Sequence, residues 1–204
     1  PLFVKHLNFK DEPEEAAKWT EEVKTKENPD AIIIIAHLGF GAGVGSKTDI
    51  STWTFTDEET KYGTLRIARA AKGANVVLGG HNHVGLMKGY LDPKSGVLIA
   101  ESYFGLVDVS KIDLEFDDAT GKFKSAKAEL IPLWTDTTGE DPKVIETIKQ
   151  FSVSVGKEMD KPLGASEVDL GSNPDGLDSP IGNWMTYAMR RQAGTDMAFQ
   201  NTSG

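Results

Sequence analysis

Two histidines separated by one residue, His81 and His83, directly follow a short apolar run and a pair of glycines. The apolar run, Val76–Leu78, is typical of a buried strand, and Gly79 and Gly80 allow the chain to leave a sheet sharply. In an extended segment, side chains two positions apart point to the same side, so both imidazoles can face one point. Neutral imidazole suits Zn and other divalent first-row metals. We therefore expect a metal-binding loop at the end of this strand.

A third histidine, His37, follows another apolar run, residues 31–36, and precedes a Leu-Gly pair. The β-branched residues of this run predict a central strand covered on both faces. Residues 39–54 are rich in Gly, Ser and Thr and too long for a tight connection, which predicts a functional or partly mobile loop. A helix should follow, starting at a capping box formed by Thr56 and Glu59. Strand, helix and strand make a β-α-β unit, so the three histidines should meet at the edge where its strands end.

The composition limits the classes of partner. The chain has 204 residues, a net charge of −9 and a pI near 5.0. Without a basic stripe, this charge argues against a nucleic-acid backbone as the main partner, although a small anionic substrate fits if a metal supplies local positive charge. The absence of cysteine excludes disulfides and thiolate metal sites. No apolar run is long enough to span a bilayer, and no signal peptide is visible in a sequence that opens on Pro1.

The rest of the first 138 residues predicts a mixed α/β sandwich rather than a purely parallel sheet. Asp11 is expected to cap an N-terminal helix. Two hairpins should follow the histidine loop, the first within residues 86–100 and the second formed by residues 107–116 and 123–133. The phase of the apolar alternation changes at residues 110–111, which predicts a β-bulge there.

The last third of the chain predicts a long helix and the start of another domain. Asp141 begins a helix whose apolar stripe continues to Met159. Residues 163–170 and 196–204 predict strands, and Ser179 is expected to cap a helix between them. The final strand has no visible partner or continuation, so we expect this second domain to be incomplete.

Three short motifs stand in a fixed order along the chain. They are Ala-His-Leu-Gly at residues 36–39, Gly-Gly-His-Asn-His at residues 79–83, and Ser-Pro-Ile-Gly-Asn-Trp at residues 179–184, followed by Asn-Thr-Ser-Gly at residues 201–204. In these motifs, and over nearly its whole length, the chain resembles the 5'-nucleotidase family.

The resemblance implies an α/β fold in three parts. Residues 1–138 would be the second half of a metallophosphoesterase domain, an αββα sandwich. Residues 139–162 would form a linker helix, and residues 163–204 would begin an α/β 5'-nucleotidase C-terminal domain, which recognises the substrate.

The resemblance also implies roles for four residues. His37 and His81 would bind one metal and His83 the other, in a centre of two divalent ions such as Zn or Mn. Two such ions roughly 3.5–4 Å apart can clamp the attacking and leaving oxygens of a phosphoester. Asn201 matches the asparagine of the family's Asn-x-Gly-Gly motif and would bind the substrate, a small phosphoester such as a nucleotide. Family membership would imply a periplasmic, secreted or cell-surface protein.

The sequence departs from the family pattern in two ways. The family's Asp-x-His, Gly-Asp and Gly-Asn-His motifs, which carry the remaining metal ligands and the histidine that assists the transition state, do not occur in it. Residues 173–178, just before the Gly-Asn helix, contain no arginine, whereas the family commonly has one shortly before this helix that helps to bind substrate. We therefore assign no catalytic residue to this chain and expect it to be inactive by itself. Either the first part of the enzyme lies upstream, or the site is degenerate.

Other interpretations of the same residues stay open. The histidines could be hydrogen-bonded loop residues, and Asn201 could be a turn residue with a left-handed backbone. The whole chain could be a non-catalytic binding or surface protein that keeps the fold. Within the enzyme class, a 2',3'-cyclic phosphodiesterase, a UDP-sugar hydrolase and a thiosulfohydrolase share the same resemblance.

Overall fold

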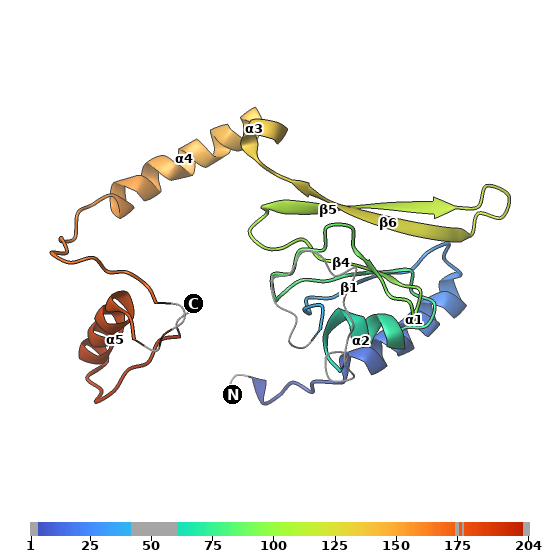
Figure 1. Ribbon diagram of the computed structural model, residues 1–204, viewed down its shortest axis with the longest axis horizontal. Coiled ribbons are helices and arrows are strands. Elements are labelled where there is room, and N and C mark those ends of the chain that lie inside the picture. Colours follow the sequence, from blue (N-terminus) through green and yellow to red (C-terminus); the bar gives the residue numbers. More distant parts are fainter. Residues whose placement is uncertain (1–3, 42–60, 174–175, 177, 202–204) are drawn as a thin grey trace. The chain divides into compact units, whose positions relative to one another are not determined.

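The computed structural model describes residues 4–41, 61–173, 176 and 178–201. The chain divides into two compact units, residues 1–140 and residues 141–204. In the described part, the helices of the first unit are α1 (Glu12–Glu27), α2 (Gly63–Ala70) and α3 (Thr135–Thr138). Its strands are β1 (Ile33–Ile35), β2 (Val76–Leu78), β3 (Tyr90–Leu91), β4 (Leu98–Ala100), β5 (Asp108–Phe116) and β6 (Phe123–Pro132). The second unit contains α4 (Pro142–Met159) and α5 (Pro180–Ala193) (Figure 1).

A four-stranded sheet lies at the centre of the first unit, in the order β1-β2-β4-β3. Strands β1, β2 and β4 are parallel, and β3 is antiparallel to β4. Helices α1 and α2 cover one face and the β5–β6 ribbon the other (Figure 1). Val77 and Ile99 pack in the helix-side core, whereas Val76 and Leu98 pack with Ala128 of the ribbon. Burial on both faces is typical of parallel strands between two layers, so the predicted mixed α/β sandwich is confirmed.

Strand β1 is not the central strand that its apolar run predicts. It lies at an edge of the sheet and, among the described residues, pairs with β2 alone. Its side chains Ile33 and Ile35 are 45% and 83% exposed. An apolar run indicates what a strand can bury, but the number of neighbouring strands depends on tertiary structure. The prediction of a strand is confirmed, and the prediction of its central position is wrong.

Three helices begin at the side-chain caps that the sequence predicts. Asp11, Asp141 and Ser179 accept hydrogen bonds from the backbone amides of Glu14 (3.2 Å), Lys143 (2.8 Å) and Gly182 (3.2 Å), respectively. Each of these helices also has proline in its first turn. A cap oxygen pairs an amide that the first turn leaves without a partner. These helix starts are therefore set by local sequence.

Helix α2 starts differently from the prediction. Its N-cap, Tyr62, makes no side-chain capping bond, and the expected capping box at residues 56–59 lies outside the described residues. The first amides of the helix, those of Thr64 and Leu65, instead donate to the carbonyl oxygens of residues 39 and 40 at 2.8 and 3.1 Å. In the described residues α2 begins at Gly63, and a distant backbone segment supplies the acceptors for its first amides. A loop that follows His37 thus becomes tied to the first turn of α2.

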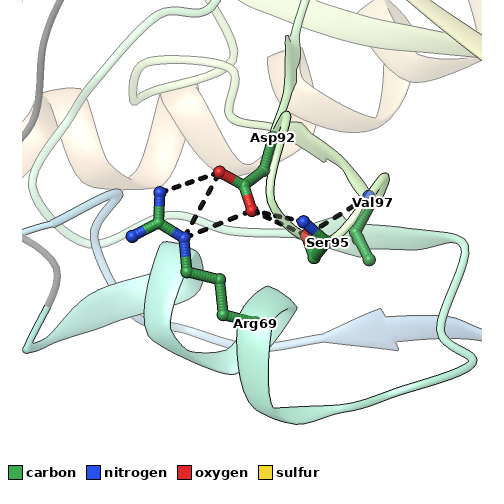
Figure 2. Close-up of polar contacts among 4 residues, drawn as sticks. All are labelled: Arg69, Asp92, Ser95 and Val97. Carbon is green, nitrogen blue, oxygen red and sulfur yellow. Dashed lines mark hydrogen bonds and ion pairs between the residues drawn. The ribbon is translucent and has the colours of Figure 1, made fainter.

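A buried ion pair fixes the other end of α2 to the β3–β4 turn (Figure 2). Asp92 is fully buried, and its carboxylate accepts hydrogen bonds from Arg69 Nη2 at 2.8 Å and from the amide and hydroxyl of Ser95 at 2.9 and 2.8 Å. Burial acts to raise the pKa of Asp92, but hydrogen bonds from Arg69 and Ser95 outweigh it and hold the pKa below its ordinary value. Both carboxylate oxygens of Asp92 accept hydrogen bonds from Arg69 or Ser95, so this ion pair connects the helix to the hairpin.

The ribbon of β5 and β6 confirms the second predicted hairpin, but the bulge lies elsewhere. Pairing runs without interruption from Asp108↔Pro132 to Glu115↔Ser125. The next pair is Phe116↔Phe123, so Lys124 is the extra residue. The predicted bulge at residues 110–111 is wrong because both faces of β5 carry apolar residues: Ile112 and Leu114 pack toward β4, while Val109 is 43% exposed on the opposite face. The first predicted hairpin is present as β3 and β4.

The second unit is helical in its described residues. Residues 163–170 and 196–201 form no strand there, contrary to prediction, because neither segment has a partner strand with which to share backbone hydrogen bonds. The predicted apolar stripe of α4 exists but is more than half exposed. Its members are Val144, Ile148, Phe151, Val155 and Met159. Neither α4 nor any other described helix combines the length and hydropathy needed to cross a membrane.

Candidate functional site

His37 and His81 lie side by side at the carboxyl ends of β1 and β2. The parallel register pairs Ile35 with Leu78, the last residue of each strand. Beyond that pair, the two segments stay hydrogen-bonded, since the amide of Ala36 donates to Leu78 O at 2.9 Å. The ring centroids of the two histidines are 5.2 Å apart with an interplanar angle of 76°. The β-α-β topology thus brings together residues that are far apart in sequence.

The loops that carry these two histidines interlock through their glycines. The amide of Gly80 donates to Leu38 O at 3.0 Å. A Cβ at Gly80 would lie 3.5 Å from His37 Nδ1, which is ordinary van der Waals distance, so the backbone of Gly80 runs close beside the imidazole. A Cβ at Gly39 would collide with the amide group of Asn82. Glycine at residue 39 therefore permits the close approach of the two loops.

His83 is oriented differently from the other two histidines. Its ring stacks on Phe104, with centroids 4.8 Å apart and an interplanar angle of 29°. Both His81 and His83 have positive φ, 91° and 56°, so the segment is not extended as expected. Alternation of side chains by two applies to extended backbone only, and the predicted geometry of this loop is wrong. In the part of the chain that the structure describes, no three His, Asp or Glu side chains are grouped closely enough to hold a metal ion.

A buried glutamate behind these loops was not predicted. Glu101 directly follows β4 and is 1% exposed, and Thr64 Oγ1 donates to its Oε1 at 3.1 Å. Burial raises the pKa of Glu101 to about 8, and the hydrogen bond from Thr64 opposes this only in part. Glu101 is therefore mostly neutral near pH 7. Its signal in the sequence is a polar residue directly after a buried apolar run, the same pattern that identifies His37.

Asn201 lies in the second unit, on a hollow at the start of α5. The hollow has a volume of about 390 Å³. Its lining includes Ser179 and Asn183 of the helix start together with Phe199 and Asn201 of the C-terminal segment. Asn201 is exposed, and its Oδ1 accepts a hydrogen bond from Gln200 Nε2 at 2.7 Å. The side chain can therefore reach a solvent-borne ligand in this hollow.

Two curated proteins are similar to the chain in sequence. The endonuclease YhcR of Bacillus subtilis (strain 168) is 25% identical over 210 residues, an alignment covering 100% of this chain and 15% of that protein. The trifunctional nucleotide phosphoesterase YfkN of the same organism is 21% identical over 98% of this chain and 13% of its own length. The chain thus spans about a seventh of the curated relatives it matches. No established protein-family profile matches the sequence.

Solved structures agree on the fold. A 5'-nucleotidase precursor from Thermus thermophilus has a TM-score of 0.64 at 22% identity, covering 92% of this chain and 36% of that one. For a putative 5'-nucleotidase from Staphylococcus aureus in complex with alpha-ketoglutarate, the TM-score is 0.62 at 18% identity. That match covers 95% of this chain and 38% of the other. The calcineurin-like phosphoesterase YfkN of Bacillus subtilis has a TM-score of 0.52 at 19% identity, and the match covers 76% of this chain and 46% of that one. The chain thus has the fold of part of a 5'-nucleotidase, as its motifs indicate.

Proposed function

We propose that this chain forms part of a metal-dependent phosphoester hydrolase that acts on nucleotides. The observation that carries the proposal is the pair of imidazoles, His37 and His81, held 5.2 Å apart at the carboxyl ends of two parallel strands. Open α/β sheets bind their ligands at this end. The fold shared with 5'-nucleotidases and the relative named a nucleotide phosphoesterase support the same interpretation.

The histidine pair fits one metal ion, and a second ion would need more ligands. With Zn–N bonds of about 2 Å in a tetrahedral site, two imidazole centroids are expected roughly 5 Å apart, close to the observed separation. We assign His37 and His81 to one divalent ion, Zn or Mn, and His83 to the other. Three histidines cannot complete two coordination shells, so the chain alone should be inactive and the active protein should include further ligands.

Bound metal would supply a Lewis acid and a hydroxide nucleophile near neutral pH. The residues of this chain would orient the site: the interlocked loops fix the directions of His37 and His81. In the second unit, Asn201 offers both a hydrogen-bond donor and an acceptor to a base or sugar in its hollow. The first unit would thus contribute to the chemistry and the second to the choice of substrate.

Two substitutions in the full-length protein test this division. His81→Ala should abolish hydrolysis of both a nucleoside monophosphate and a small aryl phosphate, because it removes a metal ligand. Asn201→Ala should raise KM for the nucleotide and leave hydrolysis of the aryl phosphate unchanged. His6→Ala serves as the matched control, because His6 is exposed and lies outside the histidine loops.

Several results would contradict the proposal. A parallel loss of both substrates in Asn201→Ala would refute the division between the units. If the His81→Ala variant still hydrolyses the substrates and a chelator abolishes that activity, the metal must bind elsewhere. A full-length protein that binds neither Zn²⁺ nor Mn²⁺ would favour the non-catalytic alternative. Internal cleavage of a nucleic acid in preference to hydrolysis of nucleotides would favour the activity named for the relative YhcR, an endonuclease.

A further inference from the structure

The carboxyl group of Glu101 lies behind both histidine loops. On one side it contacts the glycine turn that leads to His81: a Cβ at Gly79 would collide with Glu101 Oε1 and would lie 2.7 Å from Thr64 Cγ2. The backbone of Gly79 is held there, since its amide donates to Ala100 O at 2.9 Å. Glu101 and Thr64 thus form the surface against which this turn packs.

On the other side, Thr64 connects the same carboxyl group to the loop of His37. Its hydroxyl donates to Glu101 Oε1 at 3.1 Å, and its amide donates to Gly39 O at 2.8 Å. Gly39 lies two residues after His37. Helix α2 therefore begins at a point where one residue binds both Glu101 and the His37 loop.

These contacts form a continuous path from the carboxyl group to the two rings. The carboxyl group of Glu101 lies against Gly79, the backbone of the next residue, Gly80, runs beside the His37 ring, and the His37 ring lies edge-on to the His81 ring. Groups behind metal ligands orient them, and their loss typically costs 10- to 100-fold in affinity. We propose that Glu101 is a positioning residue that holds the His37 and His81 loops in register so that the two imidazoles meet. The inference rests on the proposed function for its metal, but its structural part does not.

A carboxyl group suits this position better than an apolar side chain of similar size. An apolar residue could fill the space beside Gly79, but it could not accept the hydrogen bond that directs Thr64. Burial keeps the group neutral near pH 7, since it raises the pKa of Glu101 to about 8. The fold therefore gains a hydrogen-bond acceptor here without an unpaired buried charge at that pH.

The test uses the whole chain with labelled histidine rings, of which it has four. In wild type, a nuclear Overhauser effect between the His37 and His81 rings should be present without metal. Glu101→Ala should abolish it, whereas Glu101→Gln, which keeps an acceptor for Thr64, should retain it. Thr64→Val creates no cavity and should weaken the nuclear Overhauser effect between the two rings. This variant keeps the test informative if Glu101→Ala does not fold. Titration with Zn²⁺ alone should show about 10- to 100-fold weaker binding for Glu101→Ala and near-normal binding for Glu101→Gln.

A core substitution separates positioning from general loss of stability. Val97→Ala removes buried volume from the same core, but before the start of β4, whereas Glu101 follows its end. It should lower the urea midpoint yet leave the ring contact and Zn²⁺ affinity unchanged. An intact ring contact in both Glu101→Ala and Thr64→Val, or its loss in Val97→Ala, would overturn the positioning role. Wild type with the ring contact but without Zn²⁺ binding would instead refute the proposed metal site and leave the positioning role standing.

Discussion

Glu101→Gln should make the stability of the first unit less dependent on pH. The pKa of Glu101 rises from 4.5 to about 8 in the folded chain. Between these values the folded state keeps a proton that the unfolded state has lost. The stability contributed by this proton is complete below about pH 4.5 and is lost as the pH rises to about 8. Glutamine carries no such proton and should show no such loss.

The size of the effect follows from the two pKa values. Each pKa unit corresponds to about 1.36 kcal/mol. Between pH 5 and pH 8, the unfolding free energy of wild type should therefore fall by roughly 3 kcal/mol relative to Glu101→Gln. Because Glu101 is 1% exposed, little of this difference should be lost to solvent screening.

Urea unfolding at pH 5, 6.5 and 8 measures this difference. The methyl resonances of Val77 and Ile99 are suitable probes, since both residues are fully buried in the core of the first unit. Glu27→Gln, at an exposed glutamate that ends α1, is the matched control and should follow wild type at each pH. Parallel pH profiles for wild type and Glu101→Gln would show that Glu101 is ionised in the folded chain and would refute the reasoning.

Two further predictions concern the contacts around α2 and the histidine loops. Arg69→Met should lower the unfolding free energy at pH 7 by about 3 kcal/mol, because it leaves the buried Asp92 carboxylate without its cation. The loss should shrink as the pH falls and Asp92 becomes protonated, and urea unfolding at pH 7 and pH 3 would detect this; equal losses at both would argue against the ion pair. Gly79→Ala should cost about 1–3 kcal/mol, because its Cβ meets Thr64 Cγ2 at 2.7 Å. Gly164→Ala, with no atom within 4 Å of the added Cβ, should change thermal stability by less than about 0.5 kcal/mol.

The sequence alone determined the features of this chain that depend on neighbouring residues. The caps at Asp11, Asp141 and Ser179 were predictable because each side chain bonds an amide two or three residues away. The β-α-β unit and both hairpins followed from apolar runs and turn residues. The placement of His37 beside His81 followed from the same topology, since parallel strands end at one edge of the sheet.

Only the tertiary structure decided the features that depend on a distant partner. The edge position of β1 reflects how many strands pair with it, and residues 163–170 form no strand because no described partner completes a ladder. The backbone turn at His81 and His83 replaced the expected extended segment and set the ring of His83 against Phe104. Segments far from Glu101 in sequence, Thr64 and Gly79 among them, surround its carboxyl group, and this burial raises its pKa although the hydrogen bond from Thr64 opposes the rise. Burial and charge depend on what the fold places around a residue, and no local pattern contains that information.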